Sequence, residues 1–312
     1  MWFKFLRFIL ESTIVTFILK YSKKITLPGF EKMPLYDVAR FFWKGIMEGT
    51  LAMRASAVSF SFFLALFPSI IFIFTLIPYI PIAHFQDQLL DVMKNFMPSS
   101  AYEATRETIE DIVKHQRGGL LSIGFFSALY FSTNGINALI TAFNTTYHDI
   151  ESRTGLQQRL VSLFLVIIST LLIMTAIALI IITEVISHKL FKHGEMAYYL
   201  ILGGRWIIVF ALFYFLISFT FYLGPSRKSG WKFASAGSML ATVLSLIMSV
   251  GFAYYVNNFG TYNKLYGSIG TLIVVLLWIY FNLLVVLLGF DLNASIHKAK
   301  KNKESLHNLH PL

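Results

Sequence analysis

The sequence predicts an all-α membrane protein that crosses the bilayer six times. Of its 312 residues, 56% are hydrophobic and only 13% are charged, whereas soluble domains carry about 25% charged residues. Apolar runs of about 20 residues recur along the chain, which is the length that an α-helix needs to span the hydrocarbon core. These observations disfavour an ordinary soluble domain.

The first fifty residues precede the first span and are predicted to lie on the cytoplasmic side. MWFKFLRFILESTIVTFILK is similar to a signal peptide, but Glu11 interrupts its apolar part and no small-residue cleavage site follows. We therefore expect an amphipathic helix lying in the membrane interface, and a second such helix over residues 34–49, PLYDVARFFWKGIMEG.

Six segments within residues 51–296 are long enough and poor enough in charge to cross a bilayer. The segments are Ala57–Ile82, Leu120–Phe143, Leu160–Ser187, Leu200–Gly224, Phe233–Asn257 and Gly267–Leu292. Pro68, Pro78 and Pro81 are expected to bend or end the first span, because proline lacks a backbone donor and clashes with the preceding turn.

Loop charge predicts the orientation of the spans. The two ends of the chain and the loops on their side contain eighteen Lys and Arg, and the loops on the other side contain seven. Since positive loops stay inside, both termini are expected in the cytoplasm. Residues 297–312 then form a basic cytoplasmic tail, and both basic ends of the chain are expected to contact anionic lipids.

The connection between the first two spans, residues 84–118, is the largest external piece. Phe85, Leu89 and Phe96 recur at helical spacing, and Ser100 with Glu103 forms a capping box that opens another helix. We predict an external helical hairpin.

The second predicted span carries a polar stripe. Its members follow spacings of 4, 3, 4 and 3 and therefore share one helix face: Tyr130, Asn134, Asn137, Thr141 and Asn144. Because amides facing lipid are costly, the stripe should face protein or a water-filled cavity. Hydrogen bonding between helices and the lining of a solute path both stay open, since both use these residue types at this spacing.

The fifth and sixth spans offer further candidates for a cavity lining. Ser238, Thr242 and Ser245 form a seam along the fifth span, and Asn282 lies within the sixth. Small residues also let helix backbones approach closely, so dry packing is the alternative for the seam.

Two charged residues are candidates for charge coupling. Asp291 lies near the predicted cytoplasmic end of the sixth span, and Arg54 lies at the same end of the first. A carboxylate at a helix end is often solvated or paired, and Arg54 is a candidate partner. A role in proton or cation coupling is the alternative.

Three stretches resemble a known family. They are YVNNFGTYNKLYGSIGTLIVVLLWIYFNLLVVLLGFDLNAS, RASAVSFSFFLALFPSIIF and AFNTTYHDIESRTGLQQRL. Together they resemble the YihY / virulence factor BrkB family of bacterial inner-membrane proteins, over most of residues 40–296. The resemblance implies six spans with both termini inside, in agreement with the charge count. It implies no defined activity, although the family once carried the label ribonuclease BN and has been linked to lipid or lipopolysaccharide handling.

The sequence offers no basis for nuclease chemistry. A metal-dependent nuclease needs clustered His, Asp and Glu ligands. The closest histidine pairs are His188 with His193 and His307 with His310, no acidic residue completes either, and the chain has no cysteine. We expect a protein that is not an enzyme, with no catalytic residue, no metal, no cofactor and no nucleic-acid partner.

Two functions remain after this exclusion. Polar lines inside an apolar bundle favour a transporter or translocator of a lipidic or amphiphilic solute. If the same residues serve only packing, the protein is a non-catalytic membrane scaffold or envelope-assembly factor. A homo-oligomer is compatible with either function.

Overall fold

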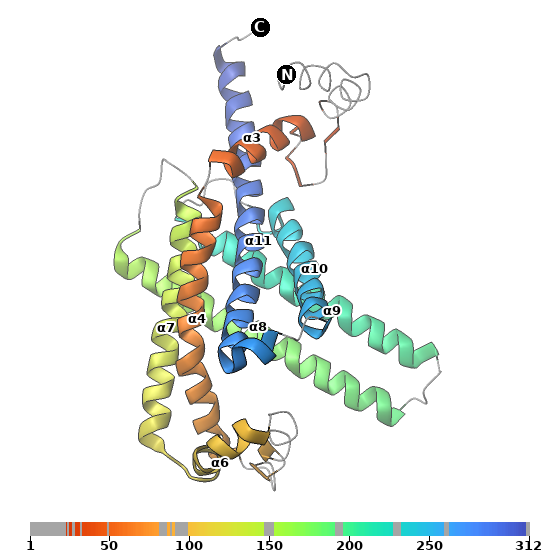
Figure 1. The fold of residues 1–312 in the computed structure, drawn as a ribbon. Helices are drawn as coiled ribbons and strands as arrows, with labels where there is room; N and C mark the ends of the chain where they lie inside the picture. The colour runs from red at the N-terminus through yellow and green to blue at the C-terminus, as the bar shows by residue number, and fades with distance from the viewer. Residues whose placement is uncertain are drawn as a thin grey trace. The chain divides into compact units, whose positions relative to one another are not determined.

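The structure is a computed structural model, and all of its regular elements within the described residues are helices (Figure 1). It describes residues 23, 25–26, 29–31, 33–48, 50–80, 86–87, 89–90, 99–146, 153–190, 196–226, 232–258 and 262–309. The elements are α3 (Leu35–Glu48), α4 (Leu51–Leu76), the 3₁₀ turn η1 (Ile77–Tyr79), α6 (Ser99–Lys114), α7 (Gly118–Asn144), α8 (Gly155–Leu190), α9 (Met196–Leu223), α10 (Ala236–Asn258) and α11 (Tyr262–Leu309).

Six of these helices are long and apolar enough to cross a membrane, which confirms the all-α, six-span prediction. They are α4, α7, α8, α9, α10 and α11. The side of the membrane on which the termini lie stays a prediction. The amphipathic helix expected over the first twenty residues falls outside the described part of the chain.

Two helices differ from their predicted bounds. α4 continues through Pro68 and ends at Leu76, where Pro78 lies in the 3₁₀ turn. α11 has 48 residues, about 72 Å at 1.5 Å per residue, whereas the hydrocarbon core is about 30 Å thick. The expected basic tail is therefore helical as far as Leu309 and continues the last span without a break.

The chain divides into two compact units, which we describe separately. Unit 1 consists of residues 1–58 and 137–312, and unit 2 consists of residues 59–136.

Unit 2 pairs the later part of α4 with the earlier part of α7. A Cβ at Gly124 would lie 3.2 Å from the Phe72 Cα, so the two helices approach closely where glycine leaves room. Beyond the helix ends, Ile77, Leu90 and Val113 form a small buried cluster that holds α6 against η1. α6 is one arm of the predicted external hairpin, and most of the other arm lies outside the described residues.

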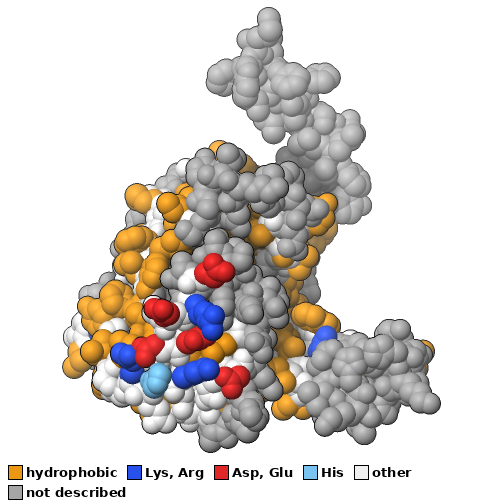
Figure 2. Space-filling model, turned by 60° about the horizontal axis from the view of Figure 1, so that its bottom comes forward, with side chains coloured by type: hydrophobic (Ala, Val, Ile, Leu, Met, Phe, Trp, Pro, Cys, Tyr) orange, Lys and Arg blue, Asp and Glu red, His pale blue; other side chains and the backbone are white. Residues whose placement is uncertain are grey.

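The surface of α6 is charged, unlike the faces of the spans. Figure 2, in which the bottom of Figure 1 comes forward, shows acidic and basic side chains mixed in one patch, with hydrophobic side chains farther out. The ion pairs here include Arg106 with Glu110, at 2.8 Å, and Lys114 with Asp87, at 3.1 Å. Exposed pairs of this kind contribute about 0–1 kcal/mol each, so we attribute the fold of this end to the apolar cluster below them.

Unit 1 is organised around α11. Its Gly289 lies against Gly237 of α10, and a Cβ on Gly289 would come within 2.7 Å of the Ala241 Cβ. On another side, Phe290 stacks on Phe143 of α7 with ring centroids 4.1 Å apart, and Phe221 of α9 meets both rings edge-on. Helices α7, α9 and α10 therefore converge on two consecutive residues of α11.

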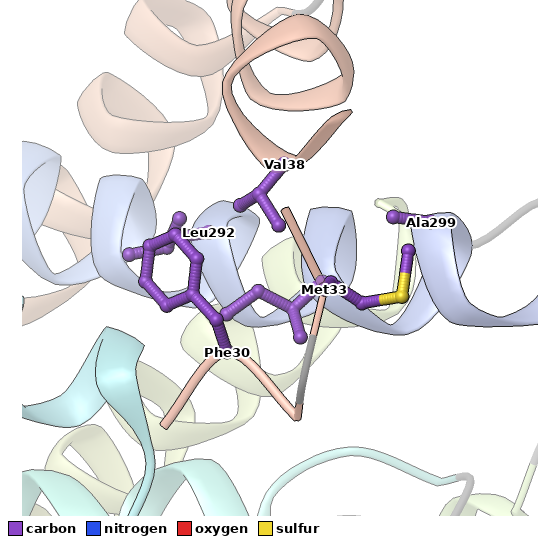
Figure 3. Packing of buried hydrophobic residues seen from close by; sticks show 6 residues of the cluster. Phe30, Met33, Val38, Leu292 and Ala299 are labelled. Atoms are coloured by element: carbon purple, nitrogen blue, oxygen red, sulfur yellow. The ribbon is translucent and has the colours of Figure 1, made fainter. Parts of the chain in front are cut away.

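α3 crosses the extended end of α11. Val38 of α3 packs with Phe30 and Met33, which precede the helix, onto Leu292 and Ala299 of α11 (Figure 3). The opposite face of α3 leaves Trp43 and Met47 exposed. This two-sided helix matches the amphipathic pattern predicted for residues 34–49, and its position at a membrane interface stays a prediction.

Candidate functional site

The buried charges of unit 1 meet where α4 begins and the apolar part of α11 ends. The Arg54 Nη2 donates to the Asp291 Oδ2 at 2.8 Å, and the two side chains are only 11% and 6% exposed. Asp291 directly follows Phe290, whose ring is buried in the aromatic cluster, so α11 holds the carboxylate firmly. The two residues suggested as partners by the sequence thus form an ion pair. Its coupling role stays a prediction.

The end of α7 completes this ion pair. The Arg54 Nη1 donates to the Ala142 carbonyl at 3.0 Å and to the Thr146 Oγ1 at 2.6 Å, and the Thr146 hydroxyl donates to the Asp291 Oδ1 at 2.9 Å. A buried ion pair is tolerated only when its remaining donors and acceptors are also satisfied. Three helices, α4, α7 and α11, are therefore joined by one polar cluster.

A second polar cluster joins α10 to α11. The Asn293 Oδ1 accepts from the Gly237 backbone N–H at 2.8 Å, and the Asn293 Nδ2 donates to the Ser235 Oγ at 2.8 Å. One amide side chain thus satisfies a backbone donor in the first turn of α10, where intrahelical partners are missing. Asn293 was not among the candidates, although it shares a helix face with Asn282 and Gly289, and that spacing could have identified it.

A third polar cluster caps the C-terminal end of α9. The Arg153 guanidinium donates to the carbonyls of Leu223, Gly224 and Pro225 at 3.1, 2.7 and 2.8 Å. Burial lowers the pKa of Arg153 from its ordinary value, although a guanidinium stays charged at neutral pH. In the sequence, Arg153 counted only as a loop charge. A side chain that caps a helix from a distant loop belongs to no periodic pattern.

The polar stripe of α7 is divided between different surroundings. The Gln158 Nε2 of α8 donates to the Asn137 Oδ1 at 2.6 Å and lies 3.3 Å from the Thr141 Oγ1. Asn144 exchanges two hydrogen bonds of 3.1 Å with Ser226. Tyr130 is 57% exposed, and Asn134 is half-buried. Gln158 was not a candidate, since a single glutamine in the first turn of a span belongs to no periodic polar pattern.

The polar seam of α10 has a different environment. Ser238, Thr242 and Ser245 are all buried, and the Thr242 hydroxyl donates to the Ser238 carbonyl of its own helix at 2.8 Å. Asn282 of α11 donates to its own Trp278 carbonyl at 2.9 Å and accepts from Ser249 at 3.3 Å. These placements favour the packing alternative, and a cavity-lining role for the four residues stays a prediction.

A small pocket of about 40 Å³ lies beside the second polar cluster. It is lined by Gly29, Glu31, Lys232, Ala234, Ser235, Asn293, Ile296 and His297. It contains none of the residues suggested as cavity lining. Among the residues that the structure describes, no group of three His, Asp or Glu side chains could hold a metal ion.

Comparison with known proteins finds matches over most of the chain. Residues 42–310 match the virulence factor BrkB family. The ribonuclease-like protein YfkH of Bacillus subtilis (strain 168) is 31% identical over 251 residues, which are 80% of this chain and 90% of that protein. The UPF0761 membrane protein NTHI0384 of Haemophilus influenzae (strain 86-028NP) is 26% identical over 266 residues, 84% of this chain and 96% of that protein.

Other relatives are only partly covered. The UPF0761 membrane protein Smlt0865 of Stenotrophomonas maltophilia (strain K279a) is 28% identical over 266 residues, which are 82% of this chain and 60% of that protein. The chain therefore spans about three fifths of the length of this relative. No solved structure matches the chain.

Proposed function

We propose, from the premise that the chain belongs to the virulence factor BrkB family of membrane proteins, that it moves a lipidic or amphiphilic solute across the membrane along the polar stripe of α7. The observation that carries this proposal is the contrast between two polar rows. The row on α10 is buried against other helices, whereas the row on α7 keeps Tyr130 and Thr141 exposed.

Asn137 and Thr141 provide the polar half of the proposed path. The Asn137 Oδ1 accepts from Gln158, and no described residue accepts a hydrogen bond from the Asn137 Nδ2. A polar group in the hydrocarbon region needs a partner or water. The head of an amphiphilic solute would supply that partner as it passes.

The hydrocarbon of the bilayer provides the apolar half of the proposed path. The side chains that α8 exposes are themselves apolar and include Phe164, Ile167 and Leu171. The tail of an amphiphile would stay in the hydrocarbon while its polar head follows α7, so that neither part enters an unfavourable medium.

The Arg54–Asp291 pair lies at one end of this proposed path. It contacts Ala142 in the last turn of α7 and Thr146 in the turn that follows the helix. We propose that transport is coupled to the charge state of this cluster, because ionisable groups within membrane spans commonly mark ion or proton pathways. We also propose a location in the bacterial inner membrane with both termini in the cytoplasm.

The second candidate function is a membrane scaffold or envelope-assembly factor without catalysis. The three polar clusters of unit 1 favour it, since they tie the starts of α4 and α10 and the ends of α7 and α9 to α11 or to a neighbouring loop. We propose no nuclease activity for this chain, because its sequence lacks a ligand cluster for the metal.

The test is lipid transfer in reconstituted vesicles. The purified protein is placed in vesicles with fluorescent phosphatidylglycerol or phosphatidylethanolamine, and an external quencher reports movement between leaflets. Asn137→Leu should slow transfer about threefold, the factor that corresponds to one lost intramembrane hydrogen bond of about 0.6 kcal/mol. Thr175→Leu is the matched control, because Thr175 is exposed on α8 and donates only to its own helix.

Two results would overturn the proposal. Wild-type protein that moves neither lipid faster than empty vesicles would remove the transport function and favour the scaffold. Equal rates for Asn137→Leu and Thr175→Leu would leave transport in place but exclude the α7 stripe as its path.

A further inference from the structure

The pocket beside the second polar cluster lies at the ends of two spans. Lys232, Ala234 and Ser235 directly precede α10, and Ile296 and His297 follow the apolar run of α11. Where a spanning helix passes from apolar to polar sequence, its residues lie at the depth of the lipid headgroups. The sequence around the pocket therefore places it in the headgroup region.

One wall of the pocket is a tight turn before α3. Gly29 and Glu31 both have positive φ, at +86° and +51°, a conformation that is uncommon for residues other than glycine. A Cβ on Gly29 would lie 3.1 Å from the Ala236 Cβ, so this turn is pressed against the start of α10. Phe30 and Met33, buried against α11 in Figure 3, hold the turn in place.

Two lysines lie near the carboxylate at the pocket. The Glu31 Oε2 pairs with the Lys300 Nζ of α11 at 2.9 Å, and the Lys232 Nζ lies 3.9 Å from the Glu31 Oε1. The two lysines remain 45% and 70% exposed, whereas Glu31 is 17% exposed. Lys300 makes the short bond and lies outside the pocket, so Lys232, the lysine of the lining, is the more loosely paired of the two.

The volume of the pocket suits a small anion. A single water needs about 10–15 Å³ of such volume, so about 40 Å³ holds a group of a few heavy atoms. Beside the Lys232 ammonium, Ile296 and Ala234 provide apolar surface at the wall. A phosphate ester with an attached apolar chain combines these properties.

We propose that this pocket binds the phosphate of an anionic phospholipid headgroup, with Lys232 as its main cationic contact. The inference is independent of transport, because a scaffold anchored by one lipid would use the same site. Free phosphate has the same chemistry, and the lipid is favoured as the source because the pocket lies at the ends of two membrane spans.

The experiment compares lipids on the purified, full-length protein in a neutral detergent. Thermal unfolding is followed while phosphatidylglycerol, phosphatidylcholine or inorganic phosphate is titrated, and the shift in Tm gives an apparent affinity. We expect saturable stabilisation by phosphatidylglycerol and none by phosphatidylcholine. Lys232→Gln should weaken the apparent affinity roughly fivefold, as expected for one lysine near an anionic headgroup.

A matched control distinguishes lipid binding at the pocket from attraction of the lipid to positive charge elsewhere on the protein. Lys303→Gln removes one charge from the exposed, basic end of α11, outside the pocket, and should leave the affinity unchanged. Ala234→Glu and Ala234→Gln differ only in charge at the pocket wall, so only the first should abolish the lipid effect. Circular dichroism without lipid verifies that each variant is folded.

Three outcomes would overturn the proposal. Equal weakening by Lys232→Gln and Lys303→Gln would mean diffuse attraction rather than a site. Equal behaviour of Ala234→Glu and Ala234→Gln would exclude an anion in the pocket. Stabilisation by inorganic phosphate that equals that of the lipid, and that depends on Lys232, would replace the lipid with a soluble ligand.

Discussion

The α7 stripe and the α10 seam have similar sequences but different surroundings. Both place small or medium polar side chains at intervals of three and four residues. On α10, Gly237 lets α11 approach until Ser238 and Thr242 are fully buried. On α7, Asn137 accepts a hydrogen bond from Gln158 of α8, and Thr141 remains exposed. The spacing of polar residues therefore identifies a helix face. The small residues next to it decide whether another helix packs against that face and buries it.

The largest expected effect concerns the ion pair that joins α4 and α7 to α11. Arg54→Met leaves the Asp291 carboxylate buried without its cation, and loss of one partner of a buried pair costs about 3–5 kcal/mol. The free energy of unfolding of the purified protein in detergent should fall by about that amount.

A double variant gives the control for this prediction. Arg54→Met with Asp291→Met should recover much of the loss, because apolar replacement of a whole buried pair is often neutral. A double variant no more stable than Arg54→Met alone would show that the hydrogen bonds to Thr146 and Ala142, rather than the buried charge, dominate.

The next effect tests the closed seam between α10 and α11. In Gly237→Ala, the added Cβ would fall on the Gly289 carbonyl oxygen, which is backbone and cannot move aside freely. We expect a loss at the upper end of the roughly 1–3 kcal/mol that is typical of overpacking.

Gly251→Ala is the control on the same helix. A Cβ there meets nothing within 4 Å, and alanine is favoured over glycine in a helix by about 0.5–1 kcal/mol. The thermal unfolding temperatures of the two variants should therefore move in opposite directions. A destabilised Gly251→Ala would mean that another surface covers this position.

A smaller effect on stability separates the two polar rows directly. Asn137→Leu and Thr242→Val each remove one polar group from a span, and intramembrane hydrogen bonds average about 0.6 kcal/mol. Both variants should therefore unfold within roughly 1 kcal/mol of the wild type. Only Asn137→Leu should slow lipid transfer, and a slower Thr242→Val would move the proposed path to α10.

The smallest expected effect comes from single cysteines that test the orientation of the protein in the membrane. The chain contains no cysteine, so single cysteines can be introduced and labelled without a background signal from native thiols. Thr108→Cys on α6 should react with an impermeant thiol reagent in intact cells, and Ser305→Cys on α11 only after permeabilisation. The reverse pattern would show that both termini lie outside, in contradiction to the charge count.

Much of the fold could be predicted because it depends on local properties of the chain. Apolar length alone identifies the six spans, since a helix must satisfy its own backbone groups in lipid. The residues that share a face on α7 or α10 follow from helical periodicity. The prolines show the limit, because the sequence did not distinguish Pro68, which lies inside α4, from Pro78, which lies in the 3₁₀ turn where α4 ends.

The amino-acid sequence by itself thus determined the all-α class, the six spans and the composition of each polar face. Only the tertiary structure decided that Gly237 and Gly289 close the α10 seam, that Arg153 caps α9, and that the turn at Gly29 forms a pocket with Lys232. Each of these contacts joins residues from different helices or loops, many of them far apart in the chain. Their partners are chosen by shape and hydrogen-bond geometry rather than by spacing, so no periodic pattern in the sequence reveals them.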